Sequence, residues 1–315
     1  MDIKCRINGK NVILHANECD RLRDVLYKSG YKSVRDSDDS EGFAGSDTIL
    51  FNGKLRYSNF ILAYQAEGAE IRTAEGLLNG RDLNYVQKAM IASGIVQSAY
   101  NAPTAALILT DLLDRKPNPT KEEIKDALSG IFIRDAGYEH YYLAVKLAIE
   151  LRDNGKFISE IAPSFRANLD IIGKPTGKID GASLVSGEPV FVEDKVPENA
   201  YVMHVLRSPF AMAYVSEINT DKAEAIDGVE SIITYKNCPD IYYMQAGQGN
   251  PEPSPHDRRL INQKVRHVGD RVAAIVAKDI ETAKKAAKLI EVKYEPLEPV
   301  FTVEEAMADN ASLVH

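Results

Sequence analysis

The sequence has little cysteine, no long apolar run and no excess of basic residues. Its three cysteines, Cys5, Cys19 and Cys238, are far apart, so no two stand at metal-ligand spacing. This argues against a disulfide framework, a zinc ribbon and a cysteine-ligated iron–sulfur cluster. No stretch approaches the ~18 consecutive apolar residues of a membrane helix. Basic residues number 38 against 46 acidic ones, so we expect neither nucleic acid nor a membrane as a partner.

Other functional signals are missing as well. The first 13 residues show no basic stretch followed by an apolar run, so we predict no signal peptide and a cytoplasmic location. No Ser/His/Asp set, phosphate-binding loop or pair of histidines at metal spacing is visible, so the sequence predicts no catalytic residue and no metal ligand. Hydrophobic residues at 44% and charged residues at 27% are typical of a soluble globular protein.

Turn and periodicity signals divide the chain into three folded blocks. The first block contains two strands around Asn8-Gly9, a helix, a polar loop and two more strands around Asn52-Gly53, which predicts a small β-grasp domain. The second block has four segments of helical period, one opened by the capping box Thr120/Glu123, which predicts a bundle. Strands and helices alternate in the third block. We therefore predict an α+β multidomain fold with a β-grasp domain, a bundle, a linker and an α/β domain, over 1–76, 82–153, 154–176 and 177–315.

The second and third blocks each contain several distinctive short motifs. The bundle segment carries Val96-Gln97, Asn118-Pro119-Thr120, Leu128-Ser129-Gly130 and Gly137-Tyr138. The third block carries Asp180-Gly-Ala, Leu206-Arg-Ser-Pro209, Val265-Arg-His-Val-Gly-Asp-Arg-Val272 and Tyr294-Glu-Pro-Leu297. Together they resemble the molybdenum hydroxylases, the xanthine dehydrogenase and aldehyde oxidase family, and most of all the N-terminal part of bacterial xanthine dehydrogenases of the selenium-dependent type. The resemblance implies a ferredoxin-like domain, a [2Fe–2S]-binding-type bundle and an α/β hammerhead domain.

The resemblance also locates the positions at which the family carries the cysteines of two [2Fe–2S] clusters. Matching on Gly45 and Thr48 puts Asp39, Ala44 and Asp47 at three positions of the first site, and the fourth, Asn59, follows the Asn52-Gly53-Lys54 turn. It puts four others at the second site: Ser98, Asn101, Ile133 and Asp135. A [2Fe–2S] cluster needs four thiolates, or His in place of some, and none of these residues is Cys or His. The resemblance therefore implies two degenerate cluster domains that bind no iron–sulfur cluster.

Two interpretations of the replacements stay open. Ile133 and Ala44 could fill space, while Asp39 and Asp47 face water. Alternatively, Asp39, Asp47 and Glu41 could hold a hard cation, although the EF-hand spacing is absent. Gln97 is the one residue with a retained parallel, because the family's Gln at this position approaches the pterin of the molybdenum cofactor. It could equally be an ordinary Gln at a helix end.

The resemblance implies a function for the whole chain. We expect the N-terminal segment or a subunit of a xanthine dehydrogenase-type oxidoreductase, structural in role and not catalytic on its own. The molybdopterin-binding domains would follow in a longer chain or lie on a partner subunit. Electrons would then reach a separate electron-transfer subunit or another acceptor. The alternative is a non-enzymatic scaffold or docking module derived from the family.

Overall fold

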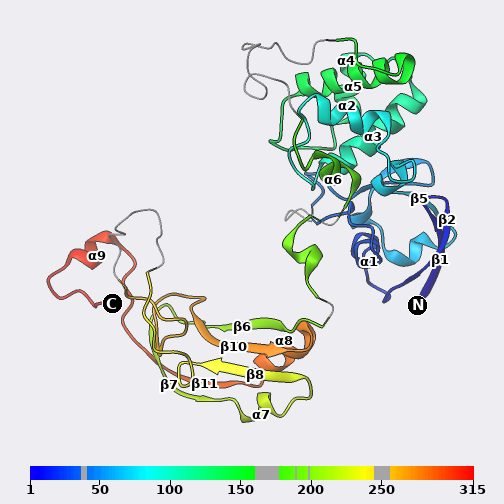
Figure 1. The fold of residues 1–315 in the computed structure, drawn as a ribbon. Helices are drawn as coiled ribbons and strands as arrows, with labels where there is room; N and C mark the ends of the chain where they lie inside the picture. Colours follow the sequence, from blue (N-terminus) through cyan, green and yellow to red (C-terminus); the bar gives the residue numbers. More distant parts are fainter. Residues whose placement is uncertain (37–40, 160–176, 189, 198, 245–255) are drawn as a thin grey trace. The chain divides into compact units, whose positions relative to one another are not determined.

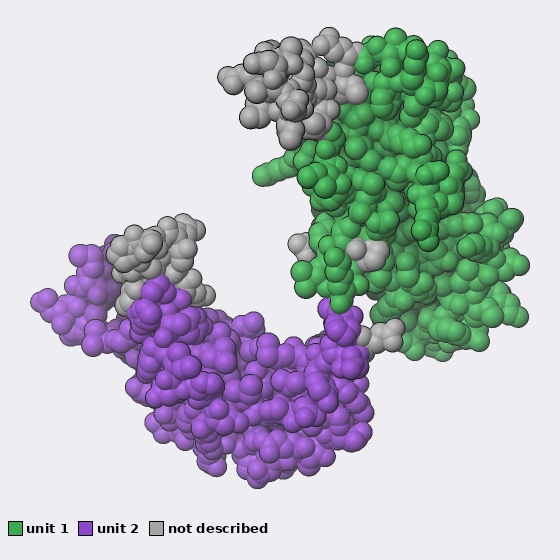
Figure 2. Space-filling view, in the orientation of Figure 1, with its two compact units in different colours: residues 1–195 green, residues 196–315 purple. Residues whose placement is uncertain are grey.

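The computed structural model describes residues 1–315 apart from 37–40, 160–176, 189, 198 and 245–255. The chain forms two compact units, Met1–Lys195 and Val196–His315 (Figure 2). No helix among the described residues is long and apolar enough to span a membrane.

A five-stranded mixed sheet forms the first part of unit 1 (Figure 1). Its strands run in the order β2-β1-β5-β3-β4, with bounds β1 Asp2–Ile7, β2 Lys10–His15, β3 Thr48–Phe51, β4 Lys54–Tyr57 and β5 Glu70–Arg72. Asn8 and Asn52, each with φ near 50°, are followed by Gly9 and Gly53 in two tight hairpin turns. Helix α1 (Leu22–Lys28) buries its apolar face against this sheet. Three short 3-10 helices follow strands β4 and β5: η1 Ser58–Phe60, η2 Ala63–Ala66 and η3 Ala74–Leu77.

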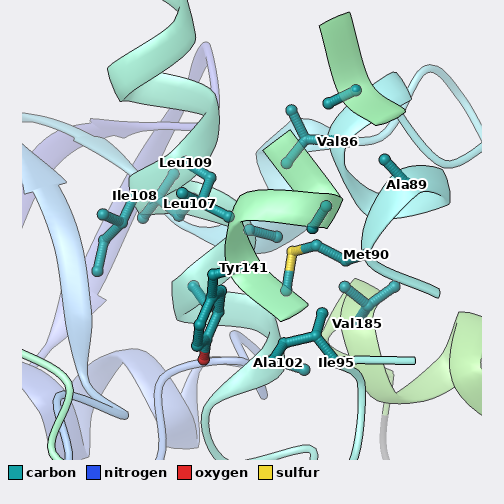
Figure 3. Close-up of a cluster of buried hydrophobic side chains, with 14 of the residues drawn as sticks. Val86, Ala89, Met90, Ile95, Ala102, Leu107, Ile108, Leu109, Tyr141 and Val185 are labelled. Atoms are coloured by element: carbon teal, nitrogen blue, oxygen red, sulfur yellow. The ribbon is translucent and has the colours of Figure 1, made fainter. Parts of the chain in front are cut away.

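Four helices form the second part of unit 1: α2 Tyr85–Ala92, α3 Ala102–Arg115, α4 Lys121–Ala127 and α5 Tyr138–Asn154. Capping boxes open α2, at Asn84 with Gln87, and α4, at Thr120 with Glu123. Helix α3 is buried along almost its whole length, because α2, α4, η3 and strand β3 pack against it. Figure 3 shows part of the shared core, in which Met90, Leu107 and Val185 come from different segments.

Residues 177–195, which the sequence prediction assigned to the third domain, belong to unit 1. Helix α6 (Gly181–Ser186) packs on α2 and α3, and Gln87 Nε2 donates a hydrogen bond of 3.1 Å to the carbonyl of Val185. The 3-10 helix η4 (Val192–Lys195) follows. The apolar side chains of α6 are part of the core of the helices, and the second compact unit begins at Val196.

Unit 2 contains two three-stranded antiparallel sheets, ordered β6-β10-β8 and β11-β7-β9 (Figure 1). Its strands are β6 Val202–Arg207, β7 Ala213–Asn219, β8 Val229–Thr234, β9 Lys264–Val265, β10 Arg271–Ala277 and β11 Glu291–Pro296. Helix α8 (Ile280–Ala287) covers β6 and β10, and its alanines pack on the small residues of β10. The short helices α7 (Asp221–Glu224) and α9 (Val303–Met307) complete the unit.

Candidate functional site

The first site is closed by hydrogen bonds between two of its own positions. Asp47 directly precedes β3 and Asn59 is the second residue after β4, so the antiparallel β3–β4 pair brings the two residues together. The backbone N–H of Asn59 donates to Asp47 Oδ2 at 2.6 Å, and both residues are buried. Ser58 Oγ donates to the carbonyl of Asp47 at 2.8 Å, and Arg21 Nη1 donates to Asn59 Oδ1 at 2.8 Å. The Asp47 carboxylate and the Asn59 amide thus both form hydrogen bonds to other groups of the protein.

The other positions of the first site contribute less. Ala44 is half-buried and offers only a methyl group, and Asp39 lies outside the described residues. Contrary to the prediction that Asp47 faces water, its side chain is buried. Within the described part of the chain, no group of three His, Cys, Asp or Glu side chains could hold a metal ion. The cation hypothesis for Asp39, Asp47 and Glu41 stays a prediction, because Asp39 is not described.

Burial raises the pKa of the Asp47 carboxyl group, and this effect exceeds the lowering by its hydrogen bonds to Asn59 and Ser58 and by the Arg23 charge. A carboxyl group whose folded-state pKa is raised stabilises the fold below its unfolded pKa. It loses that contribution as the pH rises through the folded-state value. The ionised form of Asp47 therefore costs stability at neutral pH.

We accordingly expect Asp47→Asn to raise the melting temperature of unit 1 at pH 8 by about 2–4 °C, since the amide keeps an acceptor oxygen without the buried charge. The gain should shrink toward pH 4, where Asp47 in the parent protein takes up its proton. Thermal melts at several pH values would measure it, with exposed Asp82→Asn as the control. A gain that is independent of pH would contradict the explanation.

The second site lies where α3 begins and where the chain passes from α4 to α5. Ser98 Oγ accepts a hydrogen bond of 3.1 Å from the Tyr100 N–H, and the Ser98 carbonyl accepts one from Ala102 in the first turn of α3. Asn101 is buried at the N-cap position of α3. Ile133 is partly buried and packs against the core of the bundle.

Asp135 completes the second site beside Asn101. Burial raises the pKa of Asp135 more than a hydrogen bond with the Asn101 side chain lowers it. Among the described residues, the Oδ1 atom of Asn101 is buried without a hydrogen-bond partner. Burial, together with the nearby Asp135 carboxylate, also raises the pKa of Tyr141.

The donors at these positions do not fit a [2Fe–2S] cluster. The second site offers a hydroxyl, an amide, a carboxyl group and an aliphatic side chain. The described part of the first site offers a methyl group, a buried carboxyl group and an amide already engaged by Arg21. Each iron of such a cluster needs two protein ligands, almost always thiolates. We therefore derive no electron transfer through these two sites.

Gln97 lies on the surface, in the turn between α2 and α3. Its Nε2 atom donates a hydrogen bond of 2.7 Å to the carbonyl of Gly94, which fixes the orientation of the amide. The oxygen and the second N–H of an amide can then bond elsewhere. The contact with a pterin stays a prediction, since the residues present do not test it.

The structure adds one buried charge pair that the sequence prediction missed. The side chains of Arg35 and Asp194 are 4% and 0% exposed, and their Nη2 and Oδ2 atoms are 2.9 Å apart. Tyr27 Oη donates to Asp194 at 2.6 Å, and the backbone N–H groups of Val190 and Phe191 donate at 3.0 Å each. The guanidinium of Arg35 lies over the Phe191 ring. These residues form what we call the Arg35–Asp194 anchor, which holds η4 in unit 1.

The anchor shifts the titration of its members in opposite directions. Burial disfavours the charge on Asp194, yet hydrogen bonds from Arg35 and Tyr27 outweigh it and hold the pKa of Asp194 below its usual range. Burial, and then the hydrogen bond to Asp194, raises the pKa of Tyr27 to about 12. Asp194 is therefore ionised at physiological pH and Tyr27 is protonated.

Two regions of the chain match models of known protein families. Residues 73–146 match the family model of a "[2Fe-2S] binding domain", a span that includes all four positions of the second site. Residues 186–298 match the "Aldehyde oxidase and xanthine dehydrogenase, a/b hammerhead domain".

Similar proteins cover the whole chain. The chain is 50% identical over 315 residues to the "Probable hypoxanthine oxidase XdhD" of Escherichia coli K12, matching 100% of this chain and 33% of that protein. It is 35% identical over 151 residues to the "Nicotinate dehydrogenase small FeS subunit" of Eubacterium barkeri, matching 47% of this chain and 94% of that one. The aldehyde oxidoreductase structure of Desulfovibrio desulfuricans aligns with 100% of this chain and 36% of its own, at 25% identity and a TM-score of 0.81.

These matches confirm the predicted fold class of β-grasp domain, helical bundle and hammerhead domain. The chain spans about a third of the length of its XdhD relative. The boundaries drawn between the domains stay predictions. Because the hammerhead model and these relatives match it, the chain belongs to the xanthine dehydrogenase and aldehyde oxidase family.

Proposed function

We propose that this chain is the N-terminal part, or a subunit, of a xanthine dehydrogenase-type oxidoreductase in which it binds no iron–sulfur cluster. One observation carries the proposal: neither site offers thiolates, while the fold around both sites is kept. The loop of the first site is closed by the bond between Asn59 and Asp47. The chain then acts as a structural part of the enzyme and is not catalytic alone.

The proposal assigns the chemistry to molybdopterin domains that lie outside these residues, on the same longer chain or on a partner subunit. The cofactor would supply the oxidation of the substrate when bound. Exposed Gln97 is the residue of this chain that would approach it, with its amide held by the Gly94 carbonyl. Without clusters, electrons would leave through a separate electron-transfer subunit or by direct reaction with an acceptor.

Metal analysis of the purified chain tests the clusterless proposal directly. After expression with added iron and anaerobic reconstitution, we expect no acid-labile sulfide, no bound iron and no visible absorbance of iron–sulfur type. The Eubacterium barkeri small FeS subunit, treated in parallel, serves as the positive control. Two irons and two sulfides per chain would overturn the proposal.

A matched variant sharpens this test. Replacing the four residues of the second site with cysteine, in Ser98→Cys, Asn101→Cys, Ile133→Cys and Asp135→Cys combined, should restore a red-brown cluster if the scaffold keeps the family geometry. Circular dichroism would show whether the variant folds. A folded variant without a cluster would show that more than the ligands has been lost at this site.

A further inference from the structure

In the part of the chain that the structure describes, strand β4 is the outermost strand of the five-stranded sheet on the side away from β2. A hollow of about 640 Å³ lies beside it. Its walls come from β3, β4, η1, η2, α3 and the end of α4, and they include Leu55, Phe60, Ile61, Ile108 and Ala127. Among the described residues that line it, Arg56 is the one that carries a charge.

Side chains from both faces of the sheet line this hollow. Leu55 pairs with Leu50 on the face that packs against the helices, where Ile108 of α3 lies. Arg56 pairs with Ile49 on the opposite face, which carries the core of the β-grasp domain together with Phe51 and Ile61. Since residues of both faces meet at one hollow, the hollow follows the edge of the strand rather than either face.

The backbone of the edge strand is suited to pairing. The two-residue turn at Asn52-Gly53 makes Phe51 and Lys54 a hydrogen-bonded pair, so Leu50 and Leu55 form a non-hydrogen-bonded pair. The N–H and C=O groups of Leu55 therefore point away from β3, toward the hollow. Such an edge is a template for another extended chain.

The lining defines what such a chain would carry. An added strand would point alternate side chains to the two faces, and each face offers apolar side chains, with Thr48, Gln65 and Ser129 as polar neighbours in the lining. The Phe60 side chain is 60% exposed, so it presents apolar surface to water on one side of the hollow. The exposed guanidinium of Arg56 adds a single positive charge at the edge, which a carboxylate would complement.

We propose that an extended segment of a partner protein binds as an additional strand beside β4. It carries consecutive apolar residues that enter the hollow on both faces and an acidic residue opposite Arg56. The binding site is the edge of β4, with main-chain bonds at Leu55 supplying affinity and the apolar walls supplying specificity. This inference does not depend on the absence of clusters.

A selection of short random peptides on the intact chain tests the proposal. We expect enriched peptides with a run of apolar, β-branched residues next to Asp or Glu. When a synthetic copy of the best peptide binds, hydrogen exchange at the Leu55 amide should slow at least about tenfold. Arg56→Glu should weaken binding roughly tenfold.

Lys10→Glu is the matched control, because Lys10 is an exposed basic residue on β2, the opposite edge strand. It should leave the affinity unchanged. Equal loss in both variants, binding without protection of Leu55, enrichment of peptides without an apolar run, or no enrichment at all would each overturn the proposal. A small aromatic dye that binds the hollow while no peptide does would also overturn it. Circular dichroism confirms that Arg56→Glu remains folded.

Discussion

Replacing Asp194 with alanine is expected to lower the free energy of unfolding of unit 1 by about 3–5 kcal/mol. The substitution leaves the Arg35 guanidinium buried without its carboxylate, and it removes the acceptor for Tyr27 Oη and for two backbone N–H groups. Removing one member of a buried charge pair costs more than the pair contributes, since the remaining charge cannot return to water. Denaturant unfolding of the full chain, followed by the signal of unit 1, measures the loss.

The pH dependence of this effect follows from the lowered pKa of Asp194. The stabilisation is present above the unfolded-state pKa of an aspartate, near 4, and is lost as the pH falls through the lower folded-state value. The difference between the parent protein and Asp194→Ala should therefore be constant around pH 7 and should narrow under strongly acidic conditions.

Two variants make the Asp194 result interpretable. Asp153→Ala removes the partner of Arg152 in a more exposed pair, so it should cost far less stability than Asp194→Ala. Asp194→Leu combined with Arg35→Met removes both charges and should recover part of the loss. An Asp194→Ala variant as stable as Asp153→Ala would show that the anchor does not hold unit 1 together.

The second large effect is expected at Gly45. A Cβ atom there would lie 2.6 Å from the carbonyl oxygen of Gly130, and the backbone of Gly45 has φ near +63°. The left-handed conformation costs a residue with a side chain about 1–2 kcal/mol, and overpacking against a fixed backbone costs about 1–3 kcal/mol more. We therefore expect Gly45→Ala to lower the free energy of unfolding of unit 1 by about 2–5 kcal/mol.

Gly68→Ala separates the two contributions at Gly45. Gly68 has φ near +70°, but no heavy atom lies within 4 Å of an added Cβ. Its substitution should cost only the conformational part, about 1–2 kcal/mol. Unfolding curves of the two variants, measured side by side, would show the excess at Gly45. Equal losses would mean that the Gly130 segment moves aside without cost.

Gly45 also bears on how the first site was predicted from the sequence. It was one of the two residues that located the cluster positions by resemblance, and the structure gives it a second reason to stay glycine. Its contact with Gly130 joins the β-grasp part of unit 1 to the end of α4. The packing of unit 1 therefore requires a glycine at position 45, independently of what the neighbouring positions bind.

Features with local signals were predicted well. The Asn8-Gly9 and Asn52-Gly53 turns and the Thr120/Glu123 capping box depend on neighbours within a few residues, and each lies where the sequence indicated. The second strand of the Asn52-Gly53 hairpin ends at Tyr57, and the next two residues, Ser58 and Asn59, donate hydrogen bonds to Asp47.

Features that depend on distant partners were missed. The Arg35–Asp194 anchor joins residues 159 positions apart, and Asp194 stands in the sequence beside Glu193 like any surface acid. The packing of α6 in unit 1 had no signal either, since its apolar residues suit either neighbour. At the first site, the positions stay predictions from the resemblance, and no local signal indicated that the Asn59 N–H bonds Asp47.

The anchor also sets an order of events during synthesis. Arg35 leaves the ribosome 159 residues before Asp194. At about 5–20 residues per second, the two are separated by roughly 8–32 s. The sheet and the helices can form in that interval, while the guanidinium stays hydrated. Unit 1 is therefore complete only after its final residues have been synthesised. A nascent chain that stalls before residue 194 would expose an incomplete surface to chaperones and proteases.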